Sequence, residues 1–367
     1  MKTSFPDYNN CLTNVTNSIL KYYELETYHS SLKELDGILN EKEYKNIVLI
    51  LYDGMGSKLL NRNLDENSFL RKHQVIEIDA VFPPTTTAST TSVLSGLNPN
   101  EHGWLGWDLY FEKYNKVVTM FLNKIKDTDE SICEKSISEE TYPYKNIIER
   151  INAKEDVTAT GLFPFRDMFY KDLDDMMSKI KLLCNNENKN FVYAYFEDPD
   201  LTQHFTGTDS IETKDVYKRI NKSTQELCES LKDTLVIIIA DHGHINSDVI
   251  TLTDFKDVYD LLERDISIEP RACSFKVKEG KKAEFEKIFN KYFSNYFELY
   301  TKEEVLEKQL FGPGINNENL DITIGDFLAV ATSNKYFRFN EFGTVYKSMH
   351  AGITEDEVKV PLIIYRS

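Results

Sequence analysis

The sequence has 367 residues, of which 41% are hydrophobic, which is enough for one large domain with an insertion or for two domains. Its net charge of −17 at pH 7 argues against a basic surface for a nucleic acid backbone or an anionic membrane. An acidic protein can still act on small phosphate compounds if local positive charge, usually from metal ions, balances the substrate.

Two features of the sequence indicate the cellular compartment in which the protein is expected. The start of the chain, MKTSFPDYNN, lacks the apolar segment of a signal peptide, and no apolar run approaches the ~18 residues of a membrane span. The cysteines are scattered and never spaced as CxxC, which favours free thiols over disulfides or a zinc–thiolate site. They are Cys11, Cys133, Cys184, Cys228 and Cys273. We therefore expect a soluble, cytoplasmic protein.

Short apolar runs alternate with segments of helical spacing along most of the chain. The predicted strands are 46–52, 156–163, 190–196, 234–240 and 360–365, and the predicted helices include 144–154, 171–184 and 215–232. This alternation predicts an α/β fold with a central, mostly parallel sheet and helices on both faces. In such sheets, ligands bind beyond the carboxyl ends of the strands.

The segment 256–319 departs from this alternation. It combines short strands with a Lys/Glu-rich helix that carries Phe at helical spacing, and its GPG sequence lies close to its end. We predict a small α+β cap over the strand ends that shapes specificity without supplying metal ligands. The core would then consist of residues 1–255 and 320–367.

Acidic and imidazole side chains follow the predicted strands. Asp53 follows the first strand in YDGMG, although ordinary Asp–Gly turn chemistry would also explain this motif. Asp241 and His242 follow the strand 234–240 in ADHGH, where a buried carboxylate is costly unless it is paired or bound to a cation. His244 is a second imidazole candidate in the same motif.

Two further motifs carry the same residue types. Asp200 and His204 follow the strand 190–196 and would share one face of a helix, which suits one metal; a capping Asp with a surface His is an equal alternative. His350 lies in SMHAG before the last strand, where a lone histidine is more often structural. Taken together, three Asp and three His at strand ends indicate a site for two divalent ions of the zinc class.

A run of hydroxyl side chains, PPTTTASTTS, lies at 83–92. It follows a strand-like alternation at 75–82, and helical spacing continues after it, so it is predicted to begin a helix rather than to form a linker. Backbone N–H groups at a helix start favour an anion. Metal coordination lowers the pKa of a hydroxyl and makes it a nucleophile. The run therefore predicts one threonine nucleophile, with most of the other hydroxyls as caps.

The ordered motifs LYDGMG, FPPTTTASTTSVLSGLNPNEHG, YFEDPDLTQH, ADHGH and MHAG resemble the alkaline phosphatase superfamily, specifically its type I phosphodiesterase/nucleotide pyrophosphatase family. The resemblance implies a nucleophilic threonine ten residues before Gly96, which is Thr86. It implies one metal bound by Asp53, Thr86, Asp241 and His242 and another bound by Asp200, His204 and His350. Zinc is usual in this family, and manganese is possible with such ligands.

The resemblance leaves some positions open. The place at which many diesterases carry an asparagine for a phosphoryl oxygen is Ser89 here. Thr85 and Thr87 flank Thr86, so a slip of one residue stays possible. The Asp-Ser-Ala motif of monoesterases and the Cys-x-Pro-x-Arg motif of sulfatases do not occur in the sequence.

Hydrolysis of phosphodiester or pyrophosphate bonds in nucleotide-type substrates, through a phospho-threonine, is the function that the resemblance implies. The alternatives are a phosphomonoesterase, phosphonate hydrolase or phosphomutase on the same core, or a non-catalytic binding protein that has lost its activity. We expect no polymeric nucleic acid and no membrane as partner.

Aromatic residues follow two of the candidate site segments. Trp107 and Phe165 are predicted to present a flat slot to a base or aryl group, with Arg166 as an anion contact. Trp104 and Phe163 are further candidates, and plain core packing is the more frequent role for at least two of the four aromatic residues.

Overall fold

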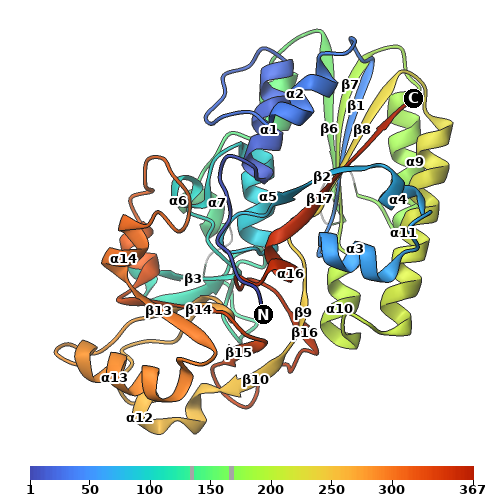
Figure 1. The fold of residues 1–367 in the computed structure, drawn as a ribbon. Helices are drawn as coiled ribbons and strands as arrows, with labels where there is room; N and C mark the ends of the chain where they lie inside the picture. Colours follow the sequence, from blue (N-terminus) through green and yellow to red (C-terminus); the bar gives the residue numbers. More distant parts are fainter. Residues whose placement is uncertain (133–135, 165–168) are drawn as a thin grey trace.

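The computed structural model, which describes residues 1–132, 136–164 and 169–367, has a central six-stranded sheet (Figure 1). The strand order is β2-β17-β8-β1-β7-β6, where β1 is Asn46–Tyr52, β2 Gln74–Asp79, β6 Val157–Leu162, β7 Lys189–Phe196, β8 Thr234–Ile239 and β17 Lys359–Arg366. Strand β1 pairs in parallel with β7 and β8, and β17 is antiparallel to both of its neighbours. The expected mostly parallel sheet is confirmed.

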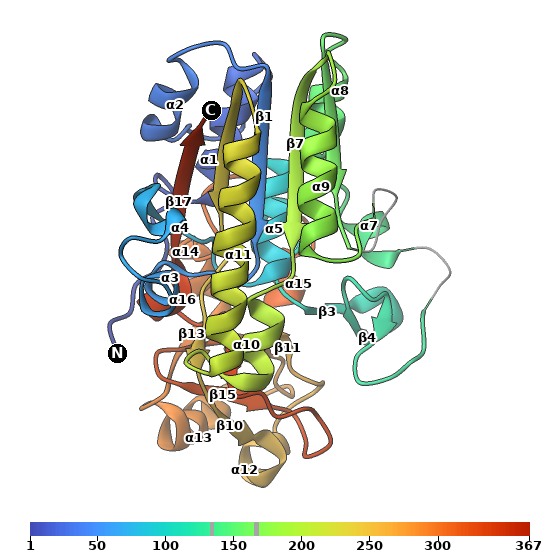
Figure 2. The ribbon, with the colours of Figure 1, turned by 90° about the vertical axis from the view of Figure 1, so that its right-hand side faces the viewer.

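Helices cover both faces of this sheet, as the sequence predicts. One face carries α1 (Leu12–Tyr22), α2 (Lys33–Leu39), α5 (Thr86–Ser95) and α8 (Ile147–Asn152), and the other carries α9 (Leu173–Cys184) and α11 (Ile211–Ser230) (Figures 1 and 2). Every residue of β1 and β8 is buried, because both faces of these strands are covered. Continuous apolar runs are typical of such strands.

Helix α5 packs on α1 through polar side chains. The Thr16 hydroxyl donates a hydrogen bond to the Val93 carbonyl oxygen at 2.7 Å, and the Asn17 amide donates to the Gly96 carbonyl oxygen at 2.9 Å. Nearly all of α5 is buried although seven of its ten residues are Thr or Ser. The contact therefore satisfies carbonyl oxygens at the carboxyl end of α5, beside apolar contacts of the same two helices in the main core.

A second, seven-stranded sheet lies beyond the carboxyl ends of the parallel strands. Its order is β13-β14-β12-β11-β3-β4-β5, where β3 is Asp108–Phe111, β4 Lys116–Thr119, β5 Lys124–Ile125, β11 Ser267–Glu269, β12 Ala272–Phe275, β13 Phe297–Thr301 and β14 Phe327–Ala331. Helix α13 (Lys282–Phe293) buries three Phe side chains against it, at the helical spacing that the sequence shows. Because β3, β4, β5 and β14 come from outside 256–319, the expected boundaries do not enclose this sheet.

The remaining elements are short. They are α3 (Ser57–Asn63), α4 (Phe69–Lys72), α6 (Pro99–His102), α7 (Ile137–Thr141), α10 (Asp200–Thr206), α12 (Lys256–Tyr259), α14 (Lys302–Glu307), α15 (Leu320–Ile324), α16 (Glu355–Val358), β9 (Ile245–Asn246), β10 (Asp248–Thr251), β15 (Lys335–Arg338) and β16 (Ser348–Met349), with 3-10 turns at Glu112–Tyr114 and Leu252–Asp254. Within the described part of the chain, each helix is too short or too polar to span a bilayer. Four cysteines are free and buried, and Cys133 lies outside the described residues.

A buried ion pair joins the second sheet to the core. Arg271, in the turn between β11 and β12, is fully buried and binds the two carboxylate oxygens of Glu357 at 2.7 and 2.8 Å. The same guanidinium donates to the carbonyl oxygens of Ser333 and Lys335. Glu357 also accepts a hydrogen bond from the Gly352 N–H at 2.7 Å. The pair therefore ties the turn to the segment that carries His350.

Removing Arg271 should destabilise the protein strongly. An Arg271→Met variant leaves the Glu357 carboxylate buried without its partner, and we expect a loss of about 3–5 kcal/mol in the free energy of unfolding. Urea denaturation of the purified variants measures this. Arg366→Met, which breaks an exposed pair with Glu41, is the matched control and should change stability by less than about 1 kcal/mol. Equal losses for the two variants would contradict the structural role.

Candidate active site

One acidic cluster lies where β1 and β8 end side by side. Asp53 follows β1 directly, and Asp241 and His242 follow β8 after one residue. The Nε2 atom of His242 lies 3.2 Å from Oδ1 of Asp53 and 3.5 Å from Oδ2 of Asp241. All three side chains are buried. The parallel pairing of β1 and β8 thus brings together residues that are far apart in the sequence.

This cluster holds more negative charge than its protein partners neutralise. Burial and the neighbouring Asp53 raise the pKa of Asp241 well above its usual value. Burial lowers the pKa of His242, but the carboxylates of Asp241 and Asp53 outweigh it and raise that pKa to about 10. Oδ1 of Asp241 accepts two backbone N–H groups, whereas its buried Oδ2 has no hydrogen-bond partner among the described residues. A cation would supply the missing charge.

Three consecutive threonine hydroxyls point to three different places. Thr86, the first residue of α5, has its Oγ1 3.2 Å from Oδ2 of Asp53 and 3.3 Å from Nε2 of His242. The Thr85 hydroxyl donates instead to Glu269 at 2.6 Å. The Thr87 hydroxyl is buried without a partner among the described residues. The geometry therefore favours Thr86 over its two neighbours as the hydroxyl of the cluster.

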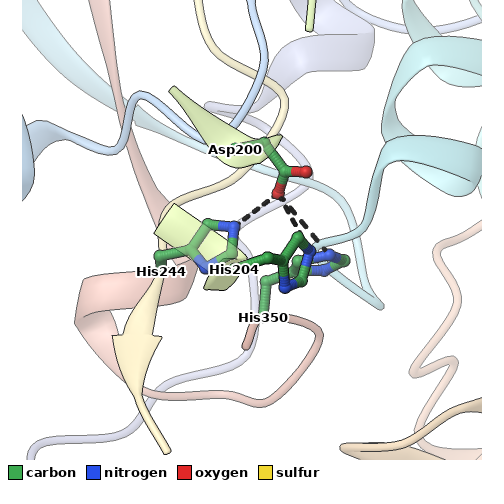
Figure 3. A group of neighbouring side chains, drawn as sticks. All are labelled: Asp200, His204, His244 and His350. Carbon is green, nitrogen blue, oxygen red and sulfur yellow. Dashed lines mark hydrogen bonds and ion pairs between the residues drawn. The ribbon is translucent and has the colours of Figure 1, made fainter. Parts of the chain in front are cut away.

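A second cluster contains Asp200, His204, His244 and His350 (Figure 3). Asp200 and His204 lie one turn apart on α10, as their spacing predicts, and Nε2 of His204 lies 3.4 Å from Oδ1 of Asp200. Nε2 of His350 lies 3.8 Å from the same oxygen, and Nε2 of His244 contacts it directly. The two clusters are adjacent, since Asp200 Oδ1 is 4.0 Å from Nε2 of His242.

The imidazole rings are held so that their Nε2 atoms face the carboxylates. Three rings have Nδ1 against a backbone carbonyl oxygen: His204 against Ser348 at 2.9 Å, His242 against Gly243 at 3.0 Å and His350 against Pro84 at 3.3 Å. A carbonyl oxygen only accepts, so each Nδ1 carries a proton and directs Nε2 into the cluster. This is the arrangement that orients histidine ligands of metals.

The donor sets fit two divalent ions. Carboxylate oxygens and imidazole nitrogens of each cluster lie close enough to share one ion, and they are the donors that zinc and manganese accept. The seven residues expected from the sequence as ligands all lie in or beside these two groups. His244, which the sequence suggested only as a further candidate, adds an imidazole to the second group.

A cavity of about 440 Å³ lies between the clusters and the second sheet. It is lined by Thr86 and His350 at one end and by Glu269, Trp107 and Tyr346 among others. A larger cavity, about 520 Å³, lies near the amino ends of β1, β6 and β7 and is lined by none of the candidate ligands in the described residues. We place the site at the smaller cavity, because the candidate chemistry is there.

The predicted substrate contacts differ in position. Trp107 lines the cavity and is 39% exposed. Trp104 is buried, with its ring N–H donating to the Tyr142 carbonyl oxygen, and Phe163 packs against the main core. Ser89 is fully buried and does not line the cavity, so a substrate contact there stays a prediction. The predictions for Phe165 and Arg166 lie outside the described residues.

Sequence reasoning did not find Glu269. This buried carboxylate lines the cavity and accepts hydrogen bonds from the Thr85 hydroxyl and the Trp107 N–H. Its strand, β11, has three residues and gives no periodic signal. The position of this Glu before Pro270 is the only feature of the sequence that hints at a cavity residue, and it is a weak signal.

Comparison with known proteins identifies the family. A family model described as type I phosphodiesterase/nucleotide pyrophosphatase matches residues 47–351. The chain belongs to this family. The expected resemblance is therefore confirmed, and the match points to an enzyme of the phosphodiesterase/pyrophosphatase type. No curated protein matches the chain in sequence.

Solved structures share the fold. The murine ectonucleotide pyrophosphatase/phosphodiesterase 5 is 18% identical with a TM-score of 0.69, and 87% of each chain is covered. An inactive variant of that protein, in which a threonine is replaced by alanine, is solved in complex with AMP and gives a TM-score of 0.68 at 18% identity, again with 87% of each chain covered. The phosphonoacetate hydrolase from Sinorhizobium meliloti, solved with phosphonoacetate, is 15% identical with a TM-score of 0.65, covering 89% of this chain and 92% of that chain.

The two clusters should bind metal separately. We expect about two divalent ions per chain in protein dialysed after loading with zinc, one for each cluster. A His204→Ala, His350→Ala double variant should retain about one ion, and Asp241→Asn should lose the other. Elemental analysis of the dialysed proteins measures this, with His73→Ala, outside both clusters, as the control. Retention of both ions by the double histidine variant would contradict the assignment.

Proposed function

We propose that the chain hydrolyses phosphodiester or pyrophosphate bonds of small nucleotide-type substrates through a phospho-threonine intermediate on Thr86, and that two divalent ions, most readily zinc, assist it. The observation that carries this proposal is the contact of the Thr86 hydroxyl with both Asp53 and His242 at the start of α5. The threonine-to-alanine variant of the murine relative, which is inactive and binds AMP, supports it by analogy.

Asp53, Asp241 and His242, with Thr86, would hold one ion, and Asp200, His204 and His350 would hold the other. Such ions supply charge stabilisation for the transferred phosphoryl group and its leaving oxygen and lower the pKa of a bound hydroxyl or water. The buried, unpartnered Oδ2 of Asp241 and the directed Nε2 atoms fit this role. His244 joins Asp200 in the second cluster.

The protein residues position an in-line displacement. Thr86 Oγ1 is held by Asp53, whose carboxylate accepts its hydrogen bond, and it faces the cavity in which phosphorus would lie. In the first step the Thr86 hydroxyl loses its proton to solvent, a bond forms between Oγ1 and phosphorus, and the bond from phosphorus to the leaving oxygen breaks. In the second step water attacks phosphorus, the bond from phosphorus to Oγ1 breaks, and Oγ1 takes up a proton, which restores the threonine hydroxyl. Holding the reacting atoms in this arrangement supplies much of the rate enhancement.

The start of α5 is free to receive the phosphoryl oxygens. A threonine before a helix usually turns its hydroxyl back to cap the first N–H groups. Thr85 makes no such bond; its hydroxyl is turned toward Glu269 and donates to that carboxylate. The N–H groups of the first turn therefore stay available to an anion, and the helix dipole favours its negative charge.

Replacement of the nucleophile tests this mechanism. Thr86→Ala should keep the fold and lower kcat on an aryl phosphodiester by several powers of ten, as removal of a nucleophile does elsewhere. Thr87→Ala removes a neighbouring buried hydroxyl without a described partner and is the matched control. Stopped reactions of the unaltered protein analysed by mass spectrometry should show one added phosphoryl group on Thr86. Full activity in Thr86→Ala would refute the proposal.

The cavity wall should contribute affinity for the base or aryl group. Trp107 lies at the cavity and is partly exposed, so an aromatic substituent would gain a stacking surface there. We expect Trp107→Ala to raise KM for nucleotide diesters by roughly fivefold to tenfold, a contribution of about 1–1.5 kcal/mol. Tyr28→Ala, an exposed aromatic residue outside the cavity, is the control. An unchanged KM would remove Trp107 from the substrate site.

Phosphonate hydrolysis is the second candidate activity. It is favoured by the structural similarity to phosphonoacetate hydrolase, which covers 89% of this chain. Phosphonoacetate should therefore be included beside aryl mono- and diesters in the first assay of the metal-loaded protein. Turnover of phosphonoacetate above that of the diester would replace the proposed function with this one.

A further inference from the structure

Glu269 is a buried carboxylate in the wall of the cavity that holds Thr86. Its Oε1 accepts the Thr85 hydroxyl at 2.6 Å and the Trp107 N–H at 2.7 Å. Its Oε2 makes no hydrogen bond within the described part of the chain, and no lysine or arginine described there pairs with it. One oxygen is therefore fixed beside the nucleophile segment, and the other is free to meet a substrate.

The backbone around Glu269 is built to present this side chain. Ile268, just before it, has a φ of +74°, an unusual conformation for a β-branched residue that often marks functional positions. The Ile268 carbonyl packs so closely on Gly106 that a Cβ there would lie 2.5 Å from its oxygen. Arg271, two residues after Glu269, is fixed by its ion pair with Glu357. The carboxylate is thus positioned from both sides.

Glu269 lines the same cavity as Thr86, so a negative charge on its side chain faces the space in which a substrate would bind. Burial raises the pKa of Glu269 to about 7, while its hydrogen bonds with Thr85 and Trp107 oppose this. Asp108 also raises the pKa and His242 lowers it. A substantial fraction of the side chain is therefore ionised at neutral pH and above.

We propose that Glu269 is a specificity-determining residue whose free Oε2 repels the second negative charge of a phosphomonoester and so favours singly charged diesters. This inference rests on the proposed function of the site. Repulsion between two like charges that share one cavity, even at an effective dielectric constant of about 20, is enough to change selectivity by roughly tenfold or more. The residue acts on substrate charge and takes no part in bond making.

The test replaces the charge and keeps the hydrogen bonds. In Glu269→Gln the amide oxygen still accepts from Thr85 and Trp107, but the carboxylate charge is lost. With matched aryl phosphate mono- and diesters at pH 8 and saturating zinc, the ratio of monoester to diester kcat/KM should rise by tenfold or more. Glu269→Asp keeps the charge and should keep a ratio close to that of the unaltered protein. Glu286→Gln, an exposed carboxylate of α13, should leave both rates unchanged.

A purely structural role predicts a different result. If Glu269 only anchors Thr85, Glu269→Gln should leave the ratio unchanged, whether or not both rates fall, and this result would overturn the inference. Thermal melting identifies variants that do not fold, and Glu269→Asn, which is also neutral, then replaces the Gln variant in the same assay.

Binding of inorganic phosphate separates this inference from the proposed function. Titration calorimetry of the zinc-loaded protein at pH 8 should show phosphate binding at least tenfold tighter in Glu269→Gln, because phosphate is mostly dianionic there. Absence of turnover on both esters in the unaltered protein would refute the proposed function alone. Equal phosphate affinity in the Gln variant and the unaltered protein would overturn the role of Glu269.

Discussion

Two buried carboxylates, Asp53 and Asp241, and the partly buried Asp200 lie together at the edge where β1, β7 and β8 end. Like charges that are removed from water repel one another strongly and are tolerated only with compensating positive charge. The chain surrounds them with imidazoles whose Nδ1 atoms are occupied by backbone carbonyls. The metal-free fold therefore carries an electrostatic cost that cations relieve. Ion binding and folding stability are linked for the same reason.

The hairpin of β11 and β12 connects the second sheet to both halves of this site. At one end of its turn, Glu269 binds Thr85, next to Thr86; at the other, Arg271 binds Glu357, which in turn holds the Gly352 N–H close to His350. A displacement of the hairpin would therefore move the segment of Thr86 and the segment of His350 together. The second sheet therefore helps to hold residues of the site in position and also lines the cavity.

The central sheet and most of the site could be predicted from the sequence because their signals are local. An apolar run marks a strand, and the residue after it, such as Asp53 or Asp241, must lie at the sheet edge. The second sheet could not be predicted, since β11 meets β3 through a single paired position, Ile268 with Asp108, across a long stretch of chain. Its short strands have little periodicity, and this also hid Glu269.

Two pairs of residues show that a sequence motif does not predict the direction of each side chain within it. Trp104 and Trp107 are three positions apart in the same motif, but one is buried in a core and the other lines the cavity. His244 follows His242 in one short motif, and the backbone turn at Gly243, packed against Gly56, separates the two rings into different clusters. Side-chain direction in loops depends on such close backbone contacts, which a single sequence does not reveal.

The hydrogen bonds between α1 and α5 have a consequence for how accurately Thr86 is placed. Apolar side chains tolerate sliding along a helix axis, whereas hydrogen bonds such as those from Thr16 to Val93 and from Asn17 to Gly96 fix the axial register. The far end of the same rigid helix carries Thr86. A segment near the start of the chain therefore acts as a mechanical stop that sets the axial position of the Thr86 hydroxyl.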